Sequence, residues 1–134
     1  MNRKKIFFLL ALIFIFSCKK AEDKCIGGSG GSLTLKVYLQ HSEHAVVNLK
    51  NYRDTVYIKY NVTEFPGYDL SAYDATLIGE WPGDYVTVPN LKCGNYFIYG
   101  VGYESVHGYR VAGGIPFTTD KKEGEVSVTI PVSE

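Results

Sequence analysis

The chain has 134 residues, enough for one compact domain with short terminal segments. Apolar residues make up 46% of it and charged residues 21%, which fits a folded domain and excludes a disordered chain. Fourteen basic side chains balance fourteen acidic ones, and the lack of a basic surplus argues against a nucleic-acid-binding protein. Eleven tyrosines and 14 glycines favour strands and turns over helices.

Residues 1–17 have the pattern of a targeting segment. Three basic residues at positions 3–5 precede an unbroken apolar run from Ile6 to Phe16. A helix of that length spans about 16 Å, roughly half of the hydrocarbon core of a bilayer, so the run is too short to cross a membrane. It predicts the apolar region of a signal peptide, which is removed from the mature protein.

The end of the apolar run resembles the lipobox of bacterial lipoproteins. Ile15-Phe16-Ser17-Cys18 places a small residue directly before a cysteine. The resemblance implies cleavage before Cys18 and acylation of its thiol and its new amino group, and several acyl chains anchor a protein more firmly than one. An ordinary secretory signal with a chance cysteine is the alternative. By the same resemblance, Lys19 favours the outer membrane, on its periplasmic or cell-surface face.

Residues 18–32 predict a lipidated, flexible tether, because charged residues are followed by a run of glycine and serine over 27–32. Two further cysteines, Cys25 and Cys93, remain in the mature chain. An oxidising envelope permits a disulfide between them, which would stabilise the fold by about 4 kcal/mol. Two unpaired cysteines are the alternative, since Cys25 falls in the predicted tether and Cys93 is expected at the far end of the domain.

Residues 33–134 predict a β-sandwich. Apolar and polar residues alternate over 33–40, 55–60 and 126–132, the period of half-buried strands. No stretch of ten residues after the signal peptide has a helical period. Further strands are expected over 46–50, 76–81, 85–88, 95–103, 109–111 and 115–118. Seven or eight short strands favour an all-β, antiparallel sandwich of the Ig-like or prealbumin-like kind.

One motif carries a family resemblance. Leu91-x-x-Gly94-x-Tyr96, followed by an apolar strand, resembles the signature of carboxypeptidase-regulatory-like, transthyretin-like (prealbumin-like) domains. Leu91 is expected between the sheets and Gly94 in a turn with positive φ. The hydroxyl of Tyr96 is expected to bond back to the turn, as in a tyrosine corner. All three roles are structural, and an Ig-like topology puts this corner at the end opposite the N-terminus.

The resemblance does not imply catalytic activity. The transthyretin superfamily includes a hydrolase with a C-terminal tyrosine-arginine-glycine-serine motif, which is missing here because the chain ends in Ile130-Pro131-Val132-Ser133-Glu134. His41 and His44 flank Ser42-Glu43 in an expected turn, where such spacing is seldom a metal site. Neither Cys93 nor His107 has the sequence pattern of a nucleophile with its base. We therefore expect no catalytic residues, no metal and no cofactor.

The loop over residues 61–75 is the best candidate for recognition. Long loops on rigid sandwiches often carry binding residues, and tyrosine offers a flat apolar face with a polar tip. The alternative is that the aromatic side chains turn inward and cap the end of the sandwich. The candidate binding residues are Phe65, Tyr68, Asp69, Tyr73, Asp74 and Trp81.

These observations favour a non-catalytic, lipid-anchored module of the cell envelope. It is expected to contact the membrane through its lipid and to display loops to a glycan, a peptide or an envelope protein, with no nucleic-acid partner. A purely structural accessory lipoprotein of an envelope assembly is the first alternative, and a small hydrolase is the second.

Overall fold

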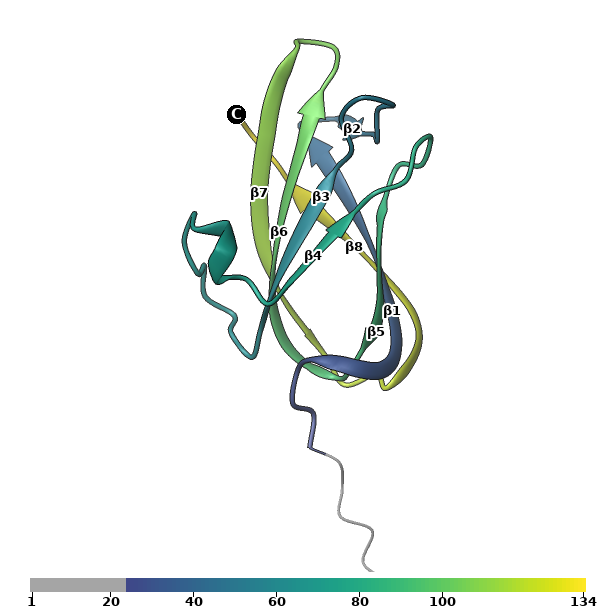
Figure 1. The fold of residues 1–134 in the computed structure, drawn as a ribbon, viewed down its shortest axis with the longest axis vertical. Coiled ribbons are helices and arrows are strands. Elements are labelled where there is room, and N and C mark those ends of the chain that lie inside the picture. Colours follow the sequence, from purple (N-terminus) through teal and green to yellow (C-terminus); the bar gives the residue numbers. More distant parts are fainter. Residues whose placement is uncertain (1–23) are drawn as a thin grey trace, which may run out of the picture.

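The computed structural model describes residues 24–134, so the predicted signal peptide and Cys18 lie outside the described residues. Eight strands form two sheets that face each other, and one short 3₁₀ helix lies in a loop between two strands (Figure 1). The expected all-β sandwich is therefore confirmed. Between Lys24 and Glu134, no helix is both long and apolar enough to cross a membrane.

The first sheet is built around β1 (Ser29–His41). The last residues of β1 pair antiparallel with β2 (His44–Val46), and its earlier part pairs antiparallel with β5 (Val86–Leu91). The final strand, β8 (Glu123–Pro131), pairs with β1 in parallel. This pair departs from the fully antiparallel expectation, because the chain passes through the second sheet before β8 returns beside β1.

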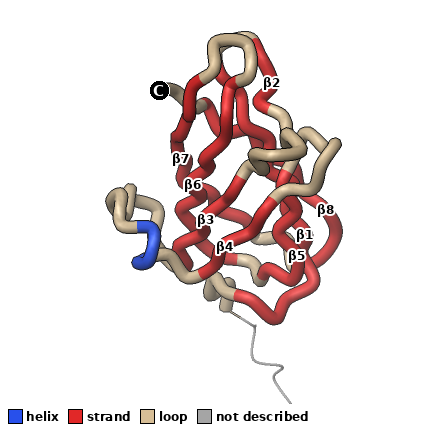
Figure 2. Tube along the Cα trace, turned by 45° about the horizontal axis from the view of Figure 1, so that its top comes forward, coloured by secondary structure: helices blue, strands red, loops and turns tan. Residues whose placement is uncertain are grey.

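The second sheet has the order β4 (Ala75–Ile78), β3 (Thr55–Tyr60), β6 (Gly94–Glu104) and β7 (Tyr109–Thr119), with antiparallel neighbours. Strand β7 joins the two short strands expected on either side of its glycine pair, since those glycines continue the ladder to β6. Figure 2 shows the 3₁₀ helix, Leu70–Ala72, in the long loop at the side of this sheet.

The core lies between the two sheets and follows from the alternation of the strands. Fifteen buried apolar side chains form its main cluster, among them Leu35, Val37, Ile58, Ile98 and Ile130. The middle of strand β6 is apolar on both faces, because Phe97, Tyr99 and Val101 belong to a separate buried cluster on the outer side of the second sheet. Something must therefore cover that outer face.

The N-terminal segment belongs to the domain, which corrects the predicted tether. Strand β1 begins at Ser29, and Cys25 forms a disulfide with Cys93, with 4.7 Å between their Cα atoms. The expectation that Cys93 lies at the far end was wrong, because β5 runs antiparallel to β1 and ends beside its start. We call this end of the sandwich, with the disulfide and the β5–β6 turn, the base.

The residues of the family motif take the expected structural roles, but at the base and not at the opposite end. Leu91 is buried in the core. The hydroxyl of Tyr96 donates to the carbonyl oxygen of Lys92 at 2.6 Å and accepts from the N–H of Gly28 at 2.9 Å. Gly94 has a φ of 146°, and a Cβ there would overlap the backbone of Gly27. The turn therefore needs glycine for both its angle and its crowding.

Candidate functional site

On the outer face of the second sheet, large side chains lie at the centre and small side chains lie along the edge strand β7. Strand pairing places Tyr57 beside Tyr99 and Tyr99 beside Gly114. The neighbouring rows of β6 and β7 pair Phe97 with a proline and Val101 with Ala112. Because β7 contributes small side chains while β3 and β6 contribute aromatic ones, a shallow channel follows β7.

The 61–74 loop covers the aromatic part of this face. The ring centroid of Phe65 lies 5.6 Å from that of Phe97 and 5.9 Å from that of Tyr99, and Tyr73 lies 6.1 Å from Tyr99. The loop therefore covers a sheet face, which differs from the expected alternative of capping the sandwich end. Tyr73 is buried, whereas Phe65 is 44% exposed and Tyr68 is 80% exposed.

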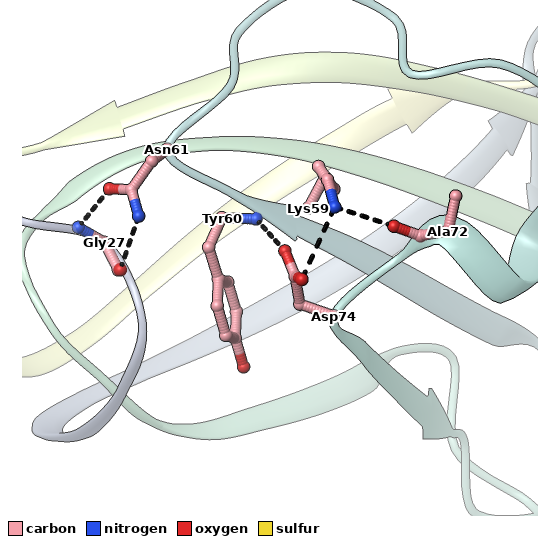
Figure 3. A network of polar contacts seen from close by, with 6 residues as sticks. All are labelled: Gly27, Lys59, Tyr60, Asn61, Ala72 and Asp74. Atoms are coloured by element: carbon pink, nitrogen blue, oxygen red, sulfur yellow. Dashed lines mark hydrogen bonds and ion pairs between the residues drawn. The ribbon is translucent and has the colours of Figure 1, made fainter.

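Polar contacts close the loop at its two ends (Figure 3). The backbone N–H of Tyr60 donates to one carboxylate oxygen of Asp74 at 2.7 Å. The ammonium of Lys59 lies 3.4 Å from the other oxygen and donates to the carbonyl of Ala72 at 2.8 Å. Asp74 thus ties the end of the loop to its beginning, so the tip keeps its place on the sheet.

A second carboxylate also serves the loop itself. One oxygen of Asp69 accepts from the backbone N–H of Ser71 at 3.0 Å and from its hydroxyl at 2.6 Å, which caps the 3₁₀ helix. These bonds lower the pKa of Asp69. The hydroxyl of Tyr73 donates to the carbonyl of Gly67 at 3.1 Å. Asp69, Tyr73 and Asp74 therefore hold the loop together, whereas the side chains of Phe65 and Tyr68 remain exposed.

A groove runs between the loop and the last residues of the chain. It has a volume of about 580 Å³ and lies between Phe65 and Tyr68 on one wall and Ser133 and Glu134 on the other. The tail is fixed there, because Ser133 and Ala112 exchange backbone hydrogen bonds of 3.0 Å and 2.8 Å. An adjoining hollow of about 420 Å³ is also lined by Tyr68, Ser133 and Glu134, and it adds Leu70 and Arg110. We refer to the two hollows together as the groove.

The groove combines aromatic faces with a few polar groups. Burial raises the pKa of Tyr99, Tyr68 raises it further, and the cationic Arg110 acts in the opposite direction. The phenol of Tyr99 is therefore protonated at neutral pH, and tyrosine hydroxyls can both donate and accept a hydrogen bond. Glu134 supplies carboxylate oxygens. This set suits stacking and hydrogen bonding to an uncharged or weakly charged ligand.

Trp81 lies elsewhere, so the structure does not bring all of the expected binding residues together. It sits in the connection between β4 and β5, at the other side of the molecule from the 61–74 loop (Figure 1). There it lines a separate hollow of about 370 Å³ with Ile78 and Tyr85. Trp81 is 52% exposed. No residue that lines its hollow also lines the groove.

Two of the histidines gather around one tyrosine, and neither of them lines the groove. The rings of His41 and His107 lie 5.6 Å and 5.8 Å from the ring of Tyr109. His107 Nδ1 is 2.9 Å from an oxygen of Glu104, which also accepts backbone bonds in the β6–β7 turn. In the described part of the chain, no three histidine, cysteine or acidic side chains are placed to hold a metal ion.

Sequence reasoning missed most of the groove, including Tyr99, Arg110, Gly114 and Glu134. One signal for it was present. Residues 95–103 are apolar at both alternating sets of positions, which predicts a strand covered on both faces. A sandwich covers only the inner face, so a loop had to cover the other. Nothing local indicates that the tail returns to β7.

No family model matches the chain, and no curated protein or solved structure matches it.

Proposed function

We propose that this protein is a lipid-anchored module of the cell envelope that binds a glycan in the groove, without catalysis. The observation that carries the proposal is the groove itself. Its exposed wall residues, Tyr68 and Phe65, stand on a loop whose ends are tied by Asp74. A tip held in place loses little conformational entropy when a ligand binds.

A glycan fits the chemistry of the groove. The C–H faces of a sugar ring are apolar and can stack on the rings of Tyr68 and Phe65, while sugar hydroxyls require donors and acceptors at their edges. The phenols, the Arg110 guanidinium and the Glu134 carboxylates supply both kinds of group. A peptide is the competing ligand and becomes an outcome of the test.

The lipid anchor is proposed from the sequence around Cys18, with the outer membrane as its site. The domain is proposed to be of the carboxypeptidase-regulatory-like, transthyretin-like kind. The roles of Leu91, Gly94 and Tyr96 in the β5–β6 turn support this assignment. Fatty-acid labelling of cells tests the anchor, and labelling that persists in Cys18→Ala would contradict it.

A purely structural accessory lipoprotein is the second candidate, and a separate surface favours it. Ile78 and Trp81 are both exposed, and together with Tyr85 they line the hollow beside the β4–β5 connection. Exposed apolar side chains that gather in one place are typical of protein contacts. An envelope protein that packs on this surface would make the chain a structural component.

Glycan and peptide arrays probed with the mature protein separate these candidates. We expect glycan binding that weakens at least tenfold in Tyr68→Ala and is unchanged in Tyr38→Ala, a matched loss of one tyrosine on the first sheet. Binding only to peptides would replace the ligand class. Binding lost in Trp81→Ala but kept in Tyr68→Ala would favour the second candidate.

A further inference from the structure

The base of the domain carries a cationic hollow. It has a volume of about 590 Å³, and three lysines, Lys24, Lys92 and Lys122, line it together with Ile26. None of the carboxylates between Lys24 and Glu134 lines it, although residues 24–134 contain nine basic and twelve acidic side chains. The hollow therefore has the opposite charge to the domain as a whole.

The neighbouring residues reduce the positive charge of the hollow but do not cancel it. The β7–β8 connection adds Lys121 and two acidic residues, Asp120 and Glu123, all of them exposed. Ile26 is 61% exposed at the hollow.

The chain enters the domain at this hollow. The disulfide fixes Cys25 to the β5–β6 turn. The backbone N–H and carbonyl of Gly27 bond to the amide of Asn61 at 2.8 Å and 3.1 Å (Figure 3), and Lys92 N–H donates to the carbonyl of Gly28 at 2.9 Å. The segment from Cys25 onward is thus held by one covalent bond and several hydrogen bonds.

This fastening shortens the link to the proposed anchor. Only six residues separate Cys18 from Cys25, and the seven steps between these two residues span at most about 25 Å when fully extended. An acylated Cys18 would therefore hold the base within that distance of the lipid headgroups. The predicted tether of residues 18–32 would have allowed the domain to turn freely.

We propose that the base docks on anionic phospholipid, with Lys24, Lys92 and Lys122 at the phosphates and Ile26 at the acyl boundary. This inference rests on the proposed anchoring at Cys18. Each lysine near an anionic membrane surface contributes modestly, but a short tether keeps the base at high effective concentration, so a few contacts suffice. The docked domain would stand on its base, with the groove on its side.

The test uses the mature chain with a lipid coupled chemically to Cys18, the one cysteine outside the disulfide. Coupling in vitro separates docking from acylation in the cell, so that failure of one is distinguishable from failure of the other. Trp81 is the single tryptophan. The double variant Ile26→Trp/Trp81→Phe therefore carries a single fluorescent reporter, which lies at the base. The vesicles contain phosphatidylcholine with brominated acyl chains, with or without phosphatidylglycerol.

We expect Trp fluorescence at position 26 to be quenched at least twofold more in vesicles with phosphatidylglycerol, and the difference to vanish at high salt. Lys92→Glu/Lys122→Glu should abolish it. Lys36→Glu/Lys50→Glu, which changes the net charge equally away from the base, should not. The melting temperature of each variant confirms folding.

Three results would overturn the proposal. Equal quenching in both kinds of vesicle would show that no anionic lipid is recognised. Quenching that persists in Lys92→Glu/Lys122→Glu would show that these lysines do not contact the lipid. Quenching of the native Trp81 in the otherwise unchanged chain, in place of a reporter at position 26, would show that the domain lies on its side.

Discussion

The two ends of the sandwich differ in how their polar groups are bonded. At the base, the disulfide, the Asn61 amide and the Tyr96 hydroxyl bind a glycine-rich segment to the β5–β6 turn. At the opposite end, Asp54 is 1% exposed and neither of its carboxylate oxygens has a hydrogen-bond partner among the described residues. The base is therefore cross-linked and its polar groups are hydrogen-bonded, whereas the opposite end contains a buried carboxyl group without a hydrogen bond.

The comparison with Glu104, at the same end as Asp54, shows what is missing. Both side chains are buried. Burial raises the pKa of Asp54 to about 7. For Glu104, burial acts in the same direction, but bonds from the N–H groups of His107 and Val106 and from the His107 ring bring its pKa below the ordinary value. Burial alone therefore does not decide ionisation, because hydrogen-bond donors can reverse its effect.

The largest expected effect comes from opening the base. The double variant Cys25→Ser/Cys93→Ser should lose about 4 kcal/mol of unfolding free energy, because it releases a loop of nearly seventy residues in the unfolded chain. Urea denaturation measures the loss, and a reductant added to the native protein should reproduce it. Cys18→Ser is the matched control and should change nothing. An unaltered midpoint in the double variant would show that hydrogen bonds alone hold the segment.

Gly94→Val should cost about 3 kcal/mol, from the strain of a positive φ together with displacement of the Gly27 backbone. Gly124→Val separates the two causes, because Gly124 also has a positive φ but no atom stands within 4 Å of its added Cβ. The control should therefore lose about 1 kcal/mol. Equal losses in thermal unfolding would mean that crowding at the base contributes nothing.

Asp54→Asn tests the opposite end. A folded pKa of about 7, above the ordinary 3.8, means that the folded state binds the proton more tightly. Stability is then fully present below about pH 4, falls by a few kcal/mol as the pH rises, and levels off above pH 7. The variant should lack this fall and be the more stable form at pH 8.

Urea titrations across this pH range measure the effect. Glu104→Gln is the control of opposite sign, since it weakens bonds that favour the charged carboxylate and should destabilise the protein at neutral pH. A wild-type stability that does not change between pH 4 and pH 8 would refute the unpaired state of Asp54.

Tyr96→Phe should have the smallest effect, about 1–2 kcal/mol, because it removes the hydroxyl between Lys92 and Gly28 but leaves the ring in the core. Tyr60→Phe is the comparison, since its ring packs edge-on against that of Tyr96 at 5.9 Å and its loss should be near zero. A similar change in both would mean that the corner hydroxyl does not fasten the segment.

Much of the fold could be predicted because it depends on local pattern. Strict alternation in β1, β3 and β8 predicted these strands, and the spacing of Leu91, Gly94 and Tyr96 predicted the corner. The end at which the corner lies was missed, because that depends on the direction of β5 relative to β1. The start of the domain was also missed, since a glycine-serine run has the composition of a tether whether or not a core side chain binds it.

The candidate site could be predicted only in part, for a similar reason. Phe65 and Tyr68 belong to one loop and could be grouped from sequence. Arg110 and Glu134 reach the groove through strand pairing and the returning tail, which no local pattern encodes. Trp81 was grouped with the loop because it is near in sequence, but β4 carries the chain away to another face. A burial such as that of Asp54 has no signal, since an acidic residue before a strand is usually solvated.

Strand β1 pairs with β8 across about ninety residues of chain. The first sheet therefore cannot be completed until the last strand has been synthesised, and contacts of such long range form slowly. A polypeptide built in this way stays open until its synthesis is nearly complete, so the sandwich folds as one unit and not strand by strand from its leading end.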